Sequence, residues 1–200
     1  MTLDEFKDNV RVKHYYGLKN KMAVKGFKNI YNHSCEVGNI AIEIANKLSF
    51  PELEQAILQI AALSHDICKI HGDNHAIVAA SLVRQEGELC YDIKNLLLDE
   101  YQIRPTEEIL DVIAFVVENH SKMDRIINNH PNEQKCRLAL VLYAADKIDK
   151  FRKCRKKGEI YLPEQFCERM DDAYGIISKE NFPVDEDIKQ TIQIIMERHR

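Results

Sequence analysis

The chain has 200 residues, of which 45% are hydrophobic, and carries a net charge of −4 at pH 7. This length allows one substantial core, and the mild negative charge argues against a nucleic acid as a partner. No uncharged apolar run reaches the roughly 18 residues that a membrane span needs, so a membrane is not expected as a partner either. The six cysteines are scattered without a C-x-x-C pair, and the first ten residues are charged; we therefore expect reduced thiols and a cytoplasmic location.

Apolar residues recur at helical spacing along most of the chain, as between Val37 and Ile44, and strand signals are nearly absent. The pattern predicts an all-α protein. We expect a single domain over residues 1–200, with a helical-bundle core at about 28–155 and a C-terminal helical extension at about 158–200. In chain order, the predicted helices cover residues 28–48, 51–69, 74–87, 91–100, 106–120, 133–156, 163–179 and 185–198.

Several ionisable residues stand at the ends of these apolar runs, where a core helix would carry them into the interior. His65 and Asp66 follow IAALS, His120 closes VVEN, and Asp146 ends LALVLYAA. A buried carboxylate needs a cation or several hydrogen-bond donors. Taken singly, each residue has a structural explanation, such as a pair between Asp146 and Lys150 four positions later. Taken together, they predict one polar cluster inside a helical bundle.

His33 belongs to the same set, because it lies one helical turn before Val37 on the predicted buried face. Imidazole suits Fe, Mn, Zn, Co or Ni, and carboxylates add oxygen donors that can bridge two ions. Asp66 and Asp146 would supply two negative charges to two divalent ions, which leaves a positive surplus. Such a surplus attracts phosphate esters. The sequence therefore predicts a metal site that takes an anionic substrate.

In these residues the chain resembles the HD-domain superfamily of metal-dependent phosphohydrolases. The signature of that superfamily is a histidine, a later His-Asp doublet and a distal aspartate, all on the helices of one bundle, and many members add two further histidines for a second metal ion. The resemblance covers roughly residues 28–155. The matching residues are His33 in NHSCEVGNIA, His65 and Asp66 in ALSHDICK, His75 in HAIVAASLV, His120 in VVENHSK and Asp146 in LYAADKID.

The resemblance implies a role for each of these residues. Two divalent ions are implied, Fe or Mn, with Zn, Mg, Co or Ni as alternatives. Asp66 is also expected to act in catalysis, together with Lys69, which follows the doublet by one turn and could contact a substrate phosphate. His71 is the alternative to His75, although His71 and Asp73 are expected to lie in an ordinary turn. By the resemblance, Asp66 bridges both ions, His33, His65 and Asp146 hold the first ion, and His75 and His120 hold the second.

A basic run extends from residue 147 to residue 157, with seven Lys or Arg and one acid. A solvated helix end would explain it, because cations suit the negative end of the helix dipole. If the substrate is anionic, however, Lys147 and Arg152 lie close enough to Asp146 to contact it. We therefore predict Lys147 and Arg152 as substrate-binding residues, and residues 155–157 as plain surface.

The segment YAADKIDKFR is also similar to the corresponding segment of symmetrical dinucleoside-tetraphosphate hydrolases of the YqeK type. The spacing from the doublet to His75 is shorter than in those proteins, and Ala79-Ala80 stands where they carry Gly-Ala. The short spacing between the His-Asp doublet and His75 is more similar to the spacing in other hydrolases with an HD domain.

The sequence thus predicts a hydrolase that cleaves a phosphate ester or anhydride through a metal-activated water. Its type could be phosphomonoesterase, phosphodiesterase or nucleotide pyrophosphohydrolase. The expected partner is a small-molecule phosphate, with a nucleotide favoured, and a homodimer is left open. Two alternatives stand beside this prediction: a di-iron oxygenase of the HD type, and a non-catalytic metal-binding regulatory module.

Overall fold

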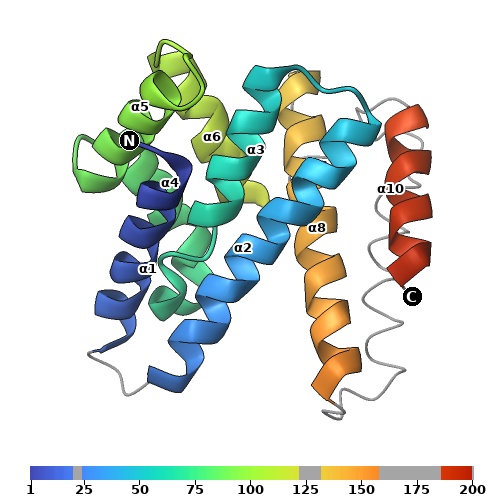
Figure 1. Cartoon of the computed structure of the whole chain (residues 1–200), viewed down its shortest axis with the longest axis horizontal. Coiled ribbons are helices and arrows are strands. Elements are labelled where there is room, and N and C mark those ends of the chain that lie inside the picture. The colour runs from blue at the N-terminus through green and yellow to red at the C-terminus, as the bar shows by residue number, and fades with distance from the viewer. Residues whose placement is uncertain (20–23, 122–131, 158–185, 200) are drawn as a thin grey trace.

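The computed structural model describes residues 1–19, 24–121, 132–157 and 186–199, and within them every regular element is helical (Figure 1). This confirms the predicted all-α class. The α-helices are α1 (Leu3–Lys19), α2 (Val24–Lys47), α3 (Glu52–Ser64), α4 (His75–Arg84), α5 (Glu88–Asp99), α6 (Glu107–Asn119), α8 (Glu133–Lys157) and α10 (Glu186–His199). One 3₁₀ helix, η1 (Lys69–Asn74), joins the doublet to α4.

The centre of the molecule is a bundle of α2, α3, α6 and α8, each of which packs on at least two of the others. Helix α4 covers α6, and α1 lies against α2 and α5 at one side. On the opposite side, α10 packs along α8 and α2 (Figure 1). Ile188, Ile192 and Ile195 of α10 are buried in the same core as the bundle. The second half of the predicted C-terminal extension is therefore helical; the predicted helix at 163–179 lies outside the described residues.

Local sequence explains how the bundle forms around the site. Helix α3 is buried over most of its length, as its apolar run requires. Helix α6 begins where the Thr106 side chain accepts a hydrogen bond from the Ile109 backbone N–H at 3.3 Å. Helices α2 and α3 approach closely at Gly38, because a Cβ there would lie 2.6 Å from Nε2 of Gln59. This close approach brings the buried face of α2 next to the end of α3.

One helix was missed, and one predicted helix was too long. Helix α1 was not expected, because the charged residues of the N-terminal segment obscured Phe6 and Val10, which lie one turn apart and are fully buried. The helix predicted over 51–69 ends at Ser64 and is followed by turns and then by η1. Gly72 has a φ of 59° and interrupts the helical backbone between α3 and α4.

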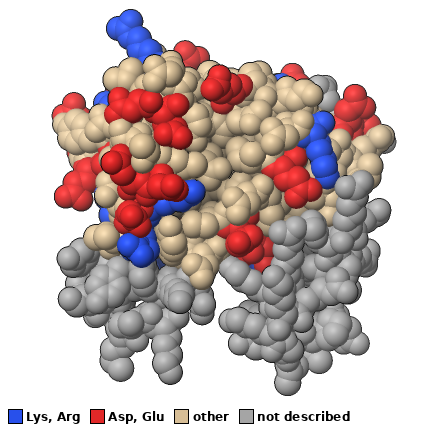
Figure 2. All heavy atoms as spheres, viewed as in Figure 1, with Lys and Arg blue, Asp and Glu red and all other residues tan. Residues whose placement is uncertain are grey.

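Cysteines, helix hydropathy and surface charge can be compared with the composition in the described part of the chain. Cys35, Cys68, Cys90 and Cys136 form no disulfide, whereas the side chains of Cys154 and Cys167 lie outside the described residues. Among the described helices, none has both the length and the apolar character to cross a membrane. On the face shown in Figure 2, acidic and basic side chains of the described residues are interspersed, without one continuous basic patch.

Candidate metal centre

The structure brings the six predicted ligands together inside the bundle. They come from five parts of the chain: α2, the turn after α3, the start of α4, the end of α6 and the middle of α8. None of the six is more than 7% exposed. They are His33, His65, Asp66, His75, His120 and Asp146. Five segments of the chain thus place imidazole and carboxylate groups at one buried point.

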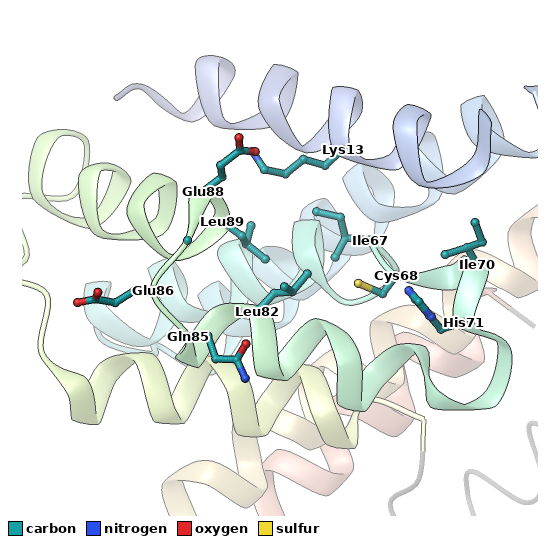
Figure 3. A pocket seen from close by; sticks show the side chains of 11 residues that line it. Lys13, Ile67, Cys68, Ile70, His71, Leu82, Gln85, Glu86, Glu88 and Leu89 are labelled. Atoms are coloured by element: carbon teal, nitrogen blue, oxygen red, sulfur yellow. The ribbon is translucent and has the colours of Figure 1, made fainter. Parts of the chain in front are cut away.

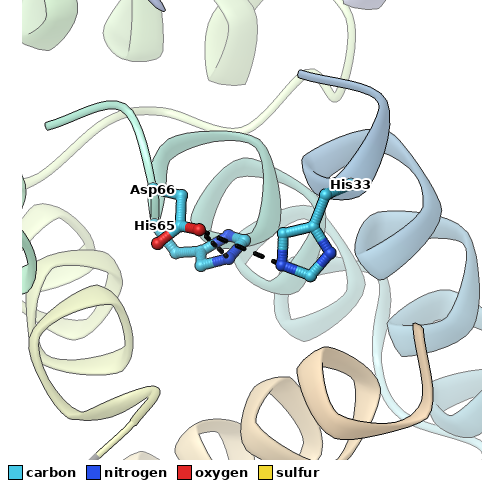
Figure 4. Close-up of side chains that lie close together, drawn as sticks. All are labelled: His33, His65 and Asp66. Atoms are coloured by element: carbon cyan, nitrogen blue, oxygen red, sulfur yellow. Dashed lines mark ion pairs between the residues drawn. The ribbon is translucent and has the colours of Figure 1, made fainter. Parts of the chain in front are cut away.

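Asp66 occupies the middle of this cluster, and each of its oxygens faces different histidines. Its Oδ2 lies 3.9 Å from Nε2 of His33 and 3.7 Å from Nε2 of His65, and these three side chains point toward one another (Figure 4). Its Oδ1 lies 3.1 Å from Nε2 of His75 and 3.8 Å from Nε2 of His120. One carboxylate is therefore shared by two sets of histidine nitrogens.

Asp146 completes one of the two sets. Its Oδ1 lies 2.9 Å from Nε2 of His33 and 3.8 Å from Nε2 of His65. We call His33, His65, Asp66 and Asp146 the first group, and Asp66, His75 and His120 the second group. Each group contains three side chains whose ligand atoms lie within 4.8 Å of one another, so that each could hold a metal ion.

Three of the histidines are oriented by backbone carbonyls. In each, Nδ1–H donates to the carbonyl three residues earlier, which leaves the Nε2 lone pair directed into the cluster. The hydrogen bonds run from His65 to Ala62 at 2.7 Å, from His75 to Gly72 at 2.6 Å and from His120 to Val117 at 2.7 Å. Nε2 of His65 is buried and has no hydrogen-bond partner. A buried nitrogen with an unused lone pair, among other imidazole and carboxylate donors, suits a transition-metal ion.

His33 is oriented in a different way, by a carboxylate. Its Nδ1 lies 2.5 Å from Oδ2 of Asp149, a residue that is only 3% exposed. Sequence reasoning missed Asp149 because it is the one acid of the basic run. The available signal was its position three residues after Asp146, on the same face of α8.

The histidines differ in protonation as well. Burial lowers the pKa of His65 to about 4 and that of His120 to about 3, so both are neutral near pH 7. Burial also lowers the pKa of His33, but hydrogen bonds with Asp146 and Asp149 outweigh it and leave that pKa raised. The neutral imidazole is the form that binds a metal ion.

Both carboxylates of the cluster are ionised. Burial alone would raise the pKa of Asp66, but electrostatic interactions with His65, His75 and Lys69 hold that pKa well below its usual value. Burial acts in the same direction on Asp146, where the charge of Lys150 is the largest opposing cause and holds the pKa well below its usual value. The cluster therefore presents two anionic oxygen donors.

Three lysines lie against these carboxylates. Lys69 Nζ is 2.9 Å from Oδ1 of Asp66, and Nζ of Lys147 and Nζ of Lys150 are 3.1 and 2.6 Å from Oδ2 of Asp146. Their side chains are 38%, 20% and 39% exposed, whereas those of the candidate ligands are nearly inaccessible. The lysines therefore extend from the buried carboxylates toward solvent. Asp146 thus pairs with Lys150, as the structural explanation of this residue expected, and also contacts His33 and His65.

The remaining predicted residues, His71 and Arg152, lie outside the described cluster for different reasons. His71 is exposed in η1 and lines a pocket of about 370 Å³ together with Ile67 and Cys68 (Figure 3). None of the six candidate ligands is among the lining residues of that pocket. The geometry therefore favours His75 over His71 for the second group. Arg152 lies in α8, but its side chain is outside the described residues.

Comparison with known proteins identifies the family and no individual relative. Neither a curated protein nor a solved structure gives a significant match, and the similarity to dinucleoside-tetraphosphate hydrolases stays a prediction. The sequence matches the HD domain over residues 30–150, which is more than half of the chain and includes all six candidate ligands. The chain belongs to the HD-domain family.

Proposed function

We propose that this protein is a metal-dependent phosphohydrolase that cleaves a phosphate ester or anhydride with a metal-activated water. The observation that carries the proposal is the position of Asp66, whose two oxygens face two separate sets of Nε2 atoms. This is the arrangement that a carboxylate shared by two ions requires. Membership in the HD-domain family, whose members are typically metal-dependent phosphohydrolases, supports the same activity.

In this proposal, the six candidate ligands form two binding positions, one for each ion. Two divalent ions, when bound, would lower the pKa of a water molecule and stabilise negative charge on the phosphate oxygens. Asp66 would bridge the ions and so set their separation. Because backbone carbonyls or Asp149 hold Nδ1 of each of the four candidate ligand histidines, their Nε2 atoms need little reorganisation to receive metal. His33, His65 and Asp146 would hold the first ion, and His75 and His120 the second.

The charges around the centre favour an anionic substrate. The carboxylates of Asp66, Asp146 and Asp149 are balanced in number by the ammonium groups of Lys69, Lys147 and Lys150. The charge of the ions would then be uncompensated by protein, and a phosphate group could neutralise it. Since the lysines are the more exposed partners of these carboxylates, they would meet a phosphate that approaches from solvent. We propose a small-molecule phosphate, with a nucleotide favoured, as the substrate.

Elemental analysis of protein purified without chelator, followed by an assay of phosphate release, tests this function. We expect two metal ions per chain, and phosphate release from nucleotides or other phosphate esters in the presence of Mn²⁺ or Fe²⁺. Removal of the ions with a chelator should abolish the release, and their return should restore it. Full hydrolysis by metal-free protein would contradict the proposal.

The same preparation separates the competing functions. The donor set of imidazoles and carboxylates also suits redox-active iron, which is the observation that supports a di-iron oxygenase. Oxygen consumption by the iron-loaded protein, without phosphate release from any nucleotide, would decide for that activity. A metal-loaded protein that is inert in both assays would indicate a regulatory module.

A further inference from the structure

One contact of the cluster has no counterpart in the second group. Nδ1 of His33 lies 2.5 Å from Oδ2 of Asp149, whereas Nδ1 of His75 and Nδ1 of His120 donate to backbone carbonyls. Asp149 is buried, and a carboxylate in such a place is costly unless it has a specific partner. His33 is such a partner, so this contact offsets the cost of burying Asp149 next to the first group.

Helix α8 holds the His33 ring from both of its nitrogens. Asp146 and Asp149 are three residues apart and therefore lie on one face of α8, the face that packs on α2. Oδ1 of Asp146 is 2.9 Å from Nε2 of His33, while Asp149 reaches Nδ1 on the other side of the ring. Asp149 thus lies behind the histidine, away from the shared carboxylate of Asp66.

We propose that Asp149 is a positioning residue of the first group: its carboxylate accepts the Nδ1 proton of His33, directs Nε2 to the first metal ion and strengthens His33 as a ligand. An acceptor with a full negative charge increases electron donation from imidazole more than a neutral carbonyl does. The inference rests on the metal-binding part of the proposed function. Its consequence is that Asp149 raises the affinity of the first ion selectively.

The variant Asp149→Asn tests this role by titration of metal-free protein with Zn²⁺ against a chromophoric chelator. Asparagine keeps the size of the side chain but can donate its amide to Nδ1, which would leave the proton on Nε2. We expect the affinity of the first ion to fall by about 10- to 100-fold, as second ligand shells typically show, and the affinity of the second ion to stay unchanged. A merely structural role would weaken both ions or neither.

Asp111→Asn is the matched control. It removes one carboxylate of the same type from α6, where Asp111 pairs with Arg84 and Lys135 away from the cluster. Both Zn²⁺ affinities should be unchanged in this variant. Equal weakening of both ions by Asp149→Asn, or no weakening at all, would overturn the proposal.

A second measurement needs no variant and so does not depend on whether Asp149→Asn folds. In the unmodified protein loaded with Zn²⁺, the ¹⁵N shifts of His33 should show a proton on Nδ1 and metal on Nε2. Coordination through Nδ1, or an Nδ1 without a proton, would overturn the role of Asp149. Because neither experiment measures hydrolysis, a protein that binds metal as described but cleaves no phosphate would contradict the hydrolase and leave this inference intact.

Discussion

The two groups of candidate ligands share Asp66 but are built differently. The first group takes His33 and Asp146 from within the long helices α2 and α8 and has the Asp149 carboxylate behind it. The second group takes its two histidines from the start of α4 and the end of α6, and each is backed by a backbone carbonyl. One half of the centre is thus rich in charge and takes two of its four ligands from within long helices, while its His65, at the end of α3, is backed by a carbonyl like the histidines of the second group. The other half is poor in charge and set where helices begin or end.

Because the two groups differ in this way, we expect them to bind a metal ion with different affinities. A cation in the first group would face the carboxylates of Asp66 and Asp146, whereas a cation in the second group would face Asp66 alone among the described carboxylates. Lysines lie against both groups, Lys69 on the Asp66 oxygen that serves the second and Lys147 and Lys150 on Asp146 of the first, but only the first group also has the Asp149 carboxylate behind one of its histidines. Since attraction between ions grows with the number of opposite charges nearby, we expect the first ion to bind more tightly.

The largest effect should come from the residue that both groups share. In Asp66→Ala the two ions lose their common ligand, so metal content and hydrolysis should fall together to background while the helical fold survives. Elemental analysis and circular dichroism of the same sample measure both. Full metal content in this variant would show that Asp66 is not the bridge.

Two single variants, each without one histidine of one group, should show the affinities of the two metal positions separately. We expect His33→Ala to lose the tighter ion and His120→Ala to lose the weaker one, so that each variant binds about one ion per chain. Zn²⁺ titration distinguishes the two outcomes by the affinity that remains. If both variants kept the same affinity, the proposed inequality of the groups would be wrong.

The pH dependence of stability should differ in sign between His120 and His33, because the pKa of His120 is lowered in the folded protein and that of His33 is raised. The pKa of His120 is lowered to about 3 in the folded protein, against roughly 6.5 for an unfolded histidine, so between these values only the unfolded chain takes up the proton. Acidification from pH 6.5 to pH 4 should therefore lower the Tm of the metal-free protein. The pKa of His33 is raised, and its contribution is full below pH 6.5 and is lost as the pH rises.

Thermal unfolding in the presence of a chelator, at several pH values, measures this difference. The fall in Tm between pH 6.5 and pH 4 should be shallower in His120→Ala than in the parent, because one destabilising protonation is removed. It should be nearly unchanged in His33→Ala, because the His33 contribution is already full below pH 6.5; this variant should instead lose the part of the fall in Tm above pH 6.5 that comes from deprotonation of His33. Identical slopes in all three proteins would contradict the assigned directions.

The smallest effect is expected at Gly72, which supports only the second group. Gly72 has a φ of 59° and a ψ of −130°, and its carbonyl accepts the proton of His75 Nδ1 at 2.6 Å. In Gly72→Ala this backbone conformation should cost about 1–3 kcal/mol and shift the carbonyl. We expect a lower Tm and a weaker second ion in Zn²⁺ titration, with the first ion unaffected.

Gly87→Ala is the matched control for this variant. Gly87 has an extended φ of 168°, and a Cβ there would meet nothing within 4 Å. Both Zn²⁺ affinities and the Tm should therefore be nearly unchanged. A loss of the first ion in Gly72→Ala would show that the two groups are coupled more strongly than their separate supports suggest.

The helices and the members of the cluster could be read from sequence because their signals are local. Apolar residues that recur with the helical period of 3.6 residues indicate a buried face without knowledge of its partner, and a polar residue at the end of such a run is a candidate for burial. His120 and Asp146 were found in this way. Helix α1 was missed because only Phe6 and Val10 of its buried face stand out among charged residues.

The sequence by itself determined which helices form and which ionisable residues they carry into the core. Tertiary structure alone decided how those residues face one another. His33 and Asp149 are 116 positions apart, and they meet only because α2 packs on α8. The choice of His75 over His71 likewise depends on η1 and on the Gly72 carbonyl. The physical reason is that hydrogen-bond acceptors orient an imidazole ring, and helix packing, not residue spacing, brings the acceptor of His33 to its ring.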